Sequence, residues 1–218
     1  MRHFVYFSKK ARTSGNFDLN NLMKAGRMDI ACQVVIMAFF VSHHTREDVK
    51  LHLVFSGGPD PVKHLEMFPG KNFMADDKKR IDISKKDIAG LIKKMLYKYK
   101  KGEKREVAPG YFIEKKNFID LIEELQEELA PNQVGLGEGV PSKEGKIFIL
   151  DKRGEDIRKF RDSELKNAVF IIGDQDGIPK KELKYLKKIA EKISVGNQMY
   201  FASQTVTIVN NELDKREI

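Results

Sequence analysis

Cysteine is nearly absent from this chain, since Cys32 is the single one among 218 residues. One cysteine cannot form an intramolecular disulfide, so we expect a reducing, cytoplasmic environment. Cys32 lies in an apolar stretch with helical spacing, and a small buried hydrophobic residue is a better interpretation than a nucleophile. Long apolar runs are also missing, and the first residues lack the apolar core of a signal peptide. We therefore expect no membrane partner.

Several motifs that define large enzyme classes are missing as well. No Walker A sequence, HExxH or Cys-x-x-Cys occurs. The glycine-rich stretch 135–139 is followed by Val140 and comes after an expected helix, which excludes the dinucleotide-binding fingerprint. The turn 174–177 lacks the further acids of a calcium-binding loop. The adjacent His43 and His44 are better explained as surface residues than as ligands, so we expect no metal.

Positive charge is what the chain has in excess, with a net charge of +8 and a pI near 9.3. Much of this excess lies between Lys78 and Arg105, where twelve Lys and Arg face three acids. Such a balance favours a polyanionic partner, with nucleic acid ahead of a membrane surface. A Lys-rich helix that is only a solvated face, or an adaptation to heat, explains the same charge.

One apolar stretch, Ala168–Ile172, predicts a strand buried on both faces. It breaks sharply at Gly173, and ligands of open α/β sheets bind just past the carboxyl ends of the strands. A glycine there lets a ligand approach the backbone. Gly173 is therefore the first candidate for a binding site. The alternative is that this glycine only ends the strand and begins a turn.

The alternation of strands and helices in the C-terminal half predicts an α/β fold with a mostly parallel sheet flanked by helices. We expect a single domain over 1–218: an N-terminal half, 1–130, with a basic helix at 84–101, then a loop at 131–146 and a ligand-binding part at 147–218. Ser84 is the expected N-cap of the basic helix. We expect strands at 4–8, 49–55, 64–68, 111–113, 147–150, 168–172 and 193–195, helices at 30–40, 118–129, 179–189 and 201–213, and a loop at 104–110.

Six short motifs follow one another in an order typical of one family. Together they resemble the archaeal tRNA (pseudouridine-N1)-methyltransferases of the SPOUT superfamily, over nearly the whole chain. The motifs are Gly26-Arg-Met-Asp29, Ala38-Phe-Phe-Val-Ser-His43, Phe55-Ser-Gly-Gly-Pro-Asp-Pro61, Gly154-Glu-Asp156, Phe170-Ile-Ile-Gly-Asp174 and Thr207-Ile-Val-Asn-Asn211.

The resemblance implies a SPOUT-type α/β fold with a C-terminal trefoil knot that holds S-adenosylmethionine, and a homodimer. It implies transfer of the cofactor's methyl group to N1 of pseudouridine-54 in the T-loop of tRNA. The family's cofactor contacts fall on Leu150, Gly173, Val195, Gly196, Asn197, Gln198, Met199, Tyr200 and Thr205.

Catalysis and RNA binding are assigned to fewer positions. We expect Arg27 to hold a phosphate or the base and Asp29 to orient a group or accept the N1 proton. The alternative, to which we give equal weight, is that Asp29 is only an acid at the start of a helix and Arg27 only an exposed residue. The RNA is expected to contact Arg27 and the lysines of the basic helix, namely Lys93, Lys94, Lys98 and Lys101.

The chain departs from the family at several positions. This chain has Gln175 where the family usually has His, and Thr205 where members have Cys. It has Gln33 and Met37 where typical members have an Arg and an Asp. The cofactor loop Gly196–Tyr200 differs from the frequent Ser-Pro-Leu-Glu-Leu. Two alternatives therefore stay open: a related SPOUT enzyme that acts on ribosomal RNA, and a non-catalytic RNA-binding or ribosome-assembly protein on the same fold.

Overall fold

The computed structural model describes residues 1–70, 84–129 and 145–218. The glycine-rich stretch 135–139, most of the expected loop 131–146 and the first part of the basic window, Lys78–Ile83, lie outside these residues. Within the described part, no helix is long and apolar enough to cross a membrane.

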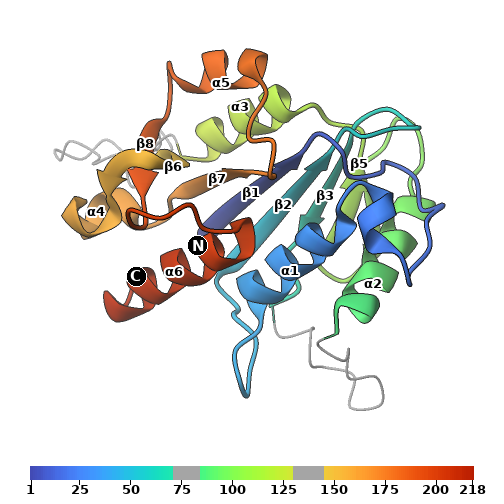
Figure 1. Cartoon of the computed structure of the whole chain (residues 1–218), viewed down its shortest axis with the longest axis horizontal. Coiled ribbons are helices and arrows are strands. Elements are labelled where there is room, and N and C mark those ends of the chain that lie inside the picture. The colour runs from blue at the N-terminus through green and yellow to red at the C-terminus, as the bar shows by residue number, and fades with distance from the viewer. Residues whose placement is uncertain (71–83, 130–144) are drawn as a thin grey trace, which may run out of the picture.

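One sheet runs through the described part of the molecule and holds eight strands in the order β4-β5-β3-β2-β1-β7-β6-β8 (Figure 1). The five strands from β2 to β8 in this order are parallel, and the other pairings are antiparallel. The strands are β1 (Arg2–Ser8), β2 (Val49–Phe55), β3 (Lys63–Met67), β4 (Arg105–Ala108), β5 (Tyr111–Glu114), β6 (Ile147–Asp156), β7 (Val169–Gly173) and β8 (Glu191–Ser194).

Helices cover both faces of this sheet. Figure 1 shows α1, α2 and α6 on one face and α3 and α5 on the other, and two separate apolar cores lie beneath them. The α-helices are α1 (Met28–Phe39), α2 (Lys85–Tyr97), α3 (Phe118–Glu128), α4 (Asp162–Leu165), α5 (Lys180–Leu186) and α6 (Ala202–Lys215), with short 3-10 turns at Leu22–Ala25 and Ile157–Lys159. The expected α/β architecture with a mostly parallel sheet is confirmed.

The expected buried strand is β7, which pairs with β1 on one side and β6 on the other. Its residues Val169–Ile172 are buried, because helices pack on both faces. Cys32 is also buried, inside α1, and burial raises the pKa of its thiol to about 12. A thiol with such a pKa is neutral at physiological pH, which agrees with its interpretation as a hydrophobic residue.

Two expectations about local structure were wrong. The segment 104–110 is not all loop, because Arg105–Ala108 forms the edge strand β4 against β5. The basic helix α2 begins after its N-cap Ser84, as expected, but ends at Tyr97 rather than near residue 101. Beyond that point the centre of the Tyr99 ring lies 4.1 Å from the Lys63 ammonium at the start of β3, a contact that favours leaving the helix.

β6 is longer than expected because its polar second half also pairs with β8. Leu150 and Glu155 are both in register with Ile193, so the strand is shifted between them. Gly154 makes this approach possible, since a Cβ there would lie 2.5 Å from the backbone nitrogen of Ile193. Close packing of the β6 and β8 backbones therefore explains the glycine of the motif Gly154-Glu-Asp156.

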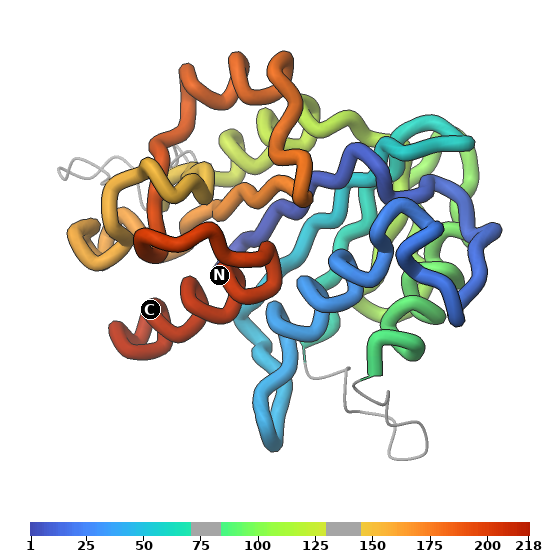
Figure 2. The backbone as a smooth tube through the Cα atoms, viewed as in Figure 1, coloured from blue at the N-terminus to red at the C-terminus, as the bar shows by residue number. Residues whose placement is uncertain are grey.

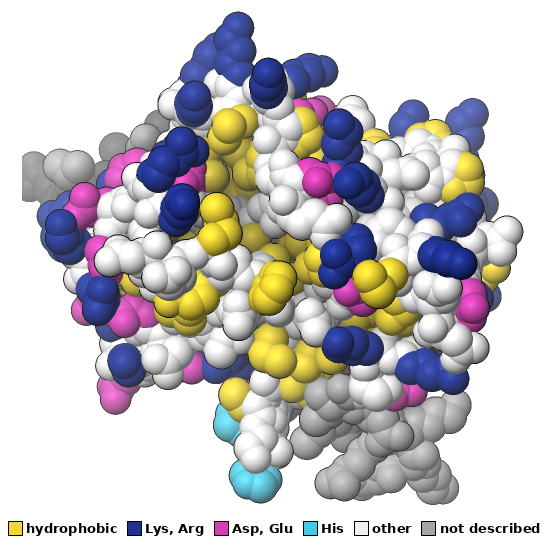
Figure 3. Space-filling model, viewed as in Figure 1, with side chains coloured by type: hydrophobic (Ala, Val, Ile, Leu, Met, Phe, Trp, Pro, Cys, Tyr) yellow, Lys and Arg dark blue, Asp and Glu magenta, His cyan; other side chains and the backbone are white. Residues whose placement is uncertain are grey.

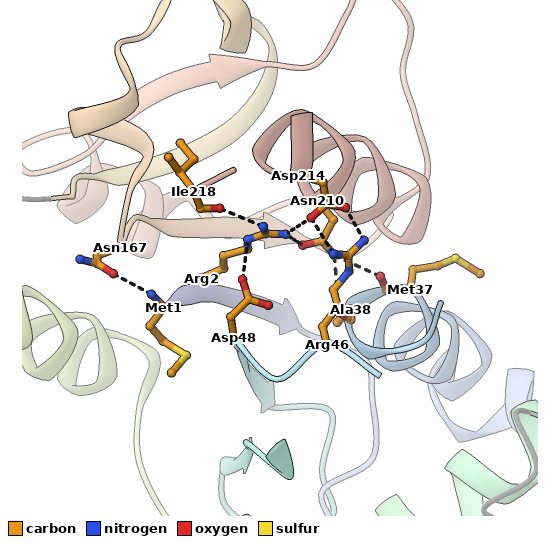
Figure 4. A network of polar contacts seen from close by, with 10 residues as sticks. All are labelled: Met1, Arg2, Met37, Ala38, Arg46, Asp48, Asn167, Asn210, Asp214 and Ile218. Carbon is orange, nitrogen blue, oxygen red and sulfur yellow. Dashed lines mark hydrogen bonds and ion pairs between the residues drawn. The ribbon is translucent and has the colours of Figure 1, made fainter. Parts of the chain in front are cut away.

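The start of β1 is tied to the last helix. Arg2 donates from Nη1 to Asp214 at 2.6 Å and from Nη2 to the carbonyl of Ile218 at 2.9 Å, and its Nε lies 3.0 Å from Asp48 (Figure 4). Arg46 donates two hydrogen bonds to the same Asp214 carboxylate. The first and last residues therefore lie close together, as the tube in Figure 2 also shows.

Candidate functional site

A cavity of about 650 Å³ opens where β6, β7 and β8 end side by side. Figure 3 shows it as a hollow near the centre of the face, with apolar side chains inside and dark-blue basic side chains around it. Ligand sites for small molecules have this size and this mainly apolar lining. The position agrees with the expected one, past the carboxyl ends of parallel strands.

The cavity brings together most of the residues that the sequence assigns to the cofactor. Asn197 alone among them is not in the lining. Arg27, assigned to catalysis, also lines the cavity, whereas Asp29 does not. The lining residues from the assigned set are Leu150, Gly173, Val195, Gly196, Gln198, Met199, Tyr200 and Thr205.

Other lining residues were not assigned from the sequence. The turn after β7 contributes Asp174–Ile178, the middle of α5 contributes Leu183, and β6 contributes Asp151–Arg153. The break of the apolar run at Gly173 is a signal for the turn. Leu183 gives no local signal, because its position depends on how α5 packs.

Gly173 holds the turn after β7 close to its own strand. A Cβ at Gly173 would lie 2.7 Å from the carbonyl carbon of Gly177 and 2.8 Å from the nitrogen of Ile178. Asp174 fixes the same turn, because its carboxylate accepts hydrogen bonds from Ser8 Oγ and the backbone nitrogens of Lys9 and Asp176. The floor of the cavity is therefore a rigid backbone turn.

Gly173→Ala is expected to weaken binding of S-adenosylmethionine about tenfold or more, because the added methyl forces the turn away from β7. Calorimetry with this nucleoside measures the effect. Gly90→Ala is the matched control, since a Cβ at Gly90, in α2, meets open space. Equal affinities of the two variants would contradict the role of Gly173.

The segment between β8 and α6 forms another wall. Ser194 Oγ donates to the carbonyl of Gly196 at 2.9 Å and accepts from its nitrogen at 3.2 Å. The hydroxyl of Thr205 donates to the carbonyl of Phe201, the N-cap of α6, so toward a ligand it can only accept a hydrogen bond. Met199 and Phe201 are 77% and 71% exposed, which places two apolar side chains at the mouth.

Arg27 is held in an unusual backbone conformation at the start of α1. Its φ of 62° is left-handed, and so is the φ of 71° at Gly26, where a Cβ would overlap the carbonyl oxygen of Lys10. For a side chain such as arginine this conformation is uncommon and costs about 1 kcal/mol or more. Strain of this kind is found where a side chain must be aimed at a site.

Two side chains fix the Arg27 guanidinium. Asp29 accepts hydrogen bonds from Nε and Nη2, both at 3.0 Å, and Gln175 accepts from Nη1 at 2.9 Å. The hydrogen bond with Asp29 raises the pKa of Arg27 further above its ordinary value. Gln175 belongs to the turn after β7, so Arg27 is linked directly to the cavity floor.

The lysines assigned to RNA lie elsewhere and differ from one another. Lys93 is partly buried and donates to the carbonyl of Phe17 at 2.7 Å. Lys94, Lys98 and Lys101 are exposed, and Lys98 and Lys101 follow the end of α2 rather than lying within it. None of the four lines the cavity.

A buried histidine cluster lies between β2 and β3. The rings of His52 and His64 are 2.9 Å apart at their nitrogens, and His64 Nδ1 lies 3.0 Å from Glu114. Burial alone would raise the pKa of Glu114, but the hydrogen bonds from His64 and Lys116 lower it to about 2. With Glu66, the two histidines could hold a metal ion. The hydrogen bonds already made explain their arrangement, and absence of a metal stays a prediction.

Acid is expected to destabilise the fold through the buried His3, stacked on His52. Burial first, and then the nearby Lys50, lowers the pKa of His3 from 6.5 to about 4. Protons therefore bind the unfolded chain more tightly than the folded one. The fold keeps its full stability above pH 6.5, and stability is lost as the pH falls from 6.5 toward 4. The loss is about 3 kcal/mol. Urea unfolding at several pH values measures it: His3→Gln should flatten the pH dependence and His43→Gln should not.

Comparison with known proteins starts with the fold. An α/β protein with a cavity at the ends of parallel strands is built to bind a small molecule there. The crystal structure of Archaeoglobus fulgidus Nep1 bound to S-adenosylhomocysteine shares this fold, with a TM-score of 0.59 and 13% identity over 99% of this chain and 98% of that one.

The family follows from the sequence as a whole. The family model described as "Putative SAM-dependent RNA methyltransferase" matches residues 1–218, and the chain belongs to this family. The family resemblance seen in the motifs is confirmed, and with it S-adenosylmethionine as cofactor and RNA methyl transfer as the activity.

Curated relatives extend over the full length. Proteins named tRNA (pseudouridine(54)-N(1))-methyltransferase are 35% identical in Methanococcus aeolicus, over 100% of both chains, and 33% identical in Methanococcoides burtonii, over 99% of this chain and 96% of the relative. A protein of the same name in Methanocaldococcus jannaschii is 31% identical over 100% of this chain and 98% of the relative.

Proposed function

We propose that this chain transfers the methyl group of S-adenosylmethionine to N1 of pseudouridine-54 in tRNA. The observation that carries the proposal is that the strand-end cavity is bordered by Arg27. A cofactor site and a polar group that can hold a nucleotide are thus next to each other. The names of the full-length relatives supply the nucleoside and its position.

The cofactor lies, in this proposal, across the ends of β6, β7 and β8. Apolar side chains such as Leu150 and Ile178 would enclose the adenine ring, and backbone groups near Gly173 and Gly196 would contact its polar edge. Gln198, Met199 and Tyr200 close the site, with Val195 and Thr205 behind them. Asn197 is the weakest member of the assigned set, because it lies outside the lining.

Methyl transfer is an in-line displacement, so placing the methyl group against N1 supplies most of the rate. The bond from sulfur to the methyl carbon would break with its electron pair left on sulfur, N1 would gain the methyl group, and the N1 proton would pass to Asp29 or to solvent water. Arg27 holds the acceptor nucleotide, and Asp29 orients Arg27, because both carboxylate oxygens are bonded to that guanidinium. Gln175 joins Arg27 to the turn that carries Gly173.

RNA contacts beyond the cavity are assigned to the basic end of α2. Lys94, Lys98 and Lys101 are exposed and available to phosphates. Lys93 contributes less, since its ammonium is bonded to Phe17. These lysines lie outside the cavity, so they would position the RNA rather than the reacting base.

A knotted chain and a cytoplasmic homodimer belong to the same proposal. β8 lies at the edge of the sheet, yet the following helix α6 packs against α1, so residues 195–201 cross the ends of inner strands (Figure 2). This crossing supports the knot over 147–218 in a single domain of 218 residues. Met37 on α1 and Phe201 at the start of α6 expose apolar surface, which supports a second copy as partner.

Nucleoside mass spectrometry tests the proposal. The purified chain and S-adenosylmethionine are incubated with a tRNA that carries pseudouridine at position 54, and with the same tRNA carrying uridine there. Methylpseudouridine is expected from the first RNA only. Methylation of ribosomal RNA instead would favour the related SPOUT enzyme, and RNA binding without transfer would favour the non-catalytic protein. No cofactor binding at millimolar concentration would refute both enzyme readings.

A further inference from the structure

Helix α5 forms one side of the cavity mouth and carries a dense group of lysines. Leu183 of α5 and Ile178, which precedes the helix, line the cavity. In Figure 3 dark-blue side chains stand above the hollow, in the region where Figure 1 places α5. Five exposed lysines belong to this segment, which we call the α5 lysine group: Lys180, Lys181, Lys184, Lys187 and Lys188.

These lysines differ from most basic residues near the cavity because they lack acidic partners. In the part of the chain that the structure describes, no ion pair or side-chain hydrogen bond ties any of the five. By contrast, Lys10 is paired with Asp176 at 2.6 Å, and Lys192 with Asp151. The α5 lysine group is therefore charge that the fold itself leaves without a counterion.

Helical spacing directs part of the group toward the cavity. Lys180, Leu183 and Lys187 are three and four residues apart, so they lie on one face of α5, and Lys184 is next to Leu183. Leu183 points into the cavity lining. Lys152, on β6, is exposed and lines the cavity as well. Positive charge thus stands on two of the elements that border the cavity, α5 and β6.

We infer that the α5 lysine group, together with Lys152 of β6, holds the phosphates of the RNA strand on either side of the nucleotide that enters the cavity. The inference rests on the proposed function and adds a substrate-binding surface at the cavity itself. A polyanion fits this surface because exposed ammonium groups that form no ion pair bind phosphates through the release of counterions. α2 supplies no lining residue and would contact the same RNA further away.

The test compares two variants that each lose three lysines, one at α5 and one far from the cavity. The triple variant Lys180→Ala, Lys184→Ala, Lys187→Ala is compared with the variant Lys50→Ala, Lys166→Ala, Lys215→Ala, which removes equal charge near the amino ends of the parallel strands. The starts of β2 and β7 lie there, next to the end of α6, where Arg2 contacts Asp214. Binding of tRNA is measured by fluorescence anisotropy over a range of salt concentrations.

The α5 variant is expected to bind tRNA about tenfold or more weakly at moderate salt, with a slope of log K against log salt shallower by about 2. Its affinity for S-adenosylmethionine should stay within about twofold of the wild type, because these side chains do not line the cavity. The control variant should keep the wild-type slope. A wild-type slope in the α5 variant, while the wild type still methylates tRNA, would overturn the inference and leave the proposed function standing.

A wild type that binds the cofactor but no RNA would overturn both. Anionic lipid vesicles provide the remaining comparison, because a basic helix also suits a membrane surface. If the α5 variant loses vesicle binding and keeps its tRNA affinity, the surface belongs to lipid and the inference is wrong.

Discussion

Asp29→Asn is expected to lower the turnover number about a hundredfold, because Arg27 loses the carboxylate that fixes it and a small misplacement of the acceptor is costly. Asparagine has one oxygen where two now accept from Nε and Nη2 of Arg27. Cofactor affinity should stay within about twofold, since Asp29 does not line the cavity. Single-turnover methylation and calorimetry measure the two quantities.

Asp120→Asn is the matched control, because Asp120 is also an acid in the first turn of a helix, α3. If Asp29 served only the dipole of α1, the two variants would lose stability alike and turnover would be unchanged. The pH profile separates two catalytic roles. A positioning role predicts the same loss at every pH, whereas a proton acceptor predicts a loss that shrinks as rising pH supplies hydroxide.

Arg2→Met is expected to reduce the free energy of unfolding by about 2 kcal/mol, because a mostly buried guanidinium loses its charge-assisted hydrogen bonds. Only 9% of the Arg2 side chain is exposed, but its partner Asp48 is 50% exposed, so water can solvate the carboxylate that is left behind. Asp214 keeps Arg46, which limits the damage to one half of the network. Urea unfolding monitored by circular dichroism gives the value.

Arg158→Met provides the comparison for Arg2. Arg158 also pairs with an aspartate, Asp156, but its side chain is largely exposed. A pair in water contributes at most about 1 kcal/mol, so the control should change stability little. A loss in the Arg2 variant no larger than this would mean that the network is solvated in solution.

Sequence patterns predicted the parts of this protein that local chemistry decides. β7 is apolar throughout because both faces are covered, and its glycine marks the turn that lines the cavity. The cofactor residues came from the family resemblance, and nearly all of them meet in one cavity. Ser84 caps α2 as its residue type predicts.

What was missed depends on contacts between distant segments. β4 exists because β5 offers an edge, and Arg105–Ala108 alone shows no clear alternation. The second half of β6 is polar, and its pairing with β8 requires Gly154. Gln175 lies 148 residues from Arg27 in sequence, so no local pattern could pair them. Such contacts follow from topology and not from propensity.

The central position of β1 has a consequence for how the protein is made. β1 is made before both of its neighbours: β2 follows soon afterwards, but β7, at Val169–Gly173, comes much later in the chain. Until that segment leaves the ribosome, one edge of β1 is an open template for pairing with other chains. The nascent chain therefore carries an aggregation-prone edge through most of its translation, and rapid release or a chaperone protects it best.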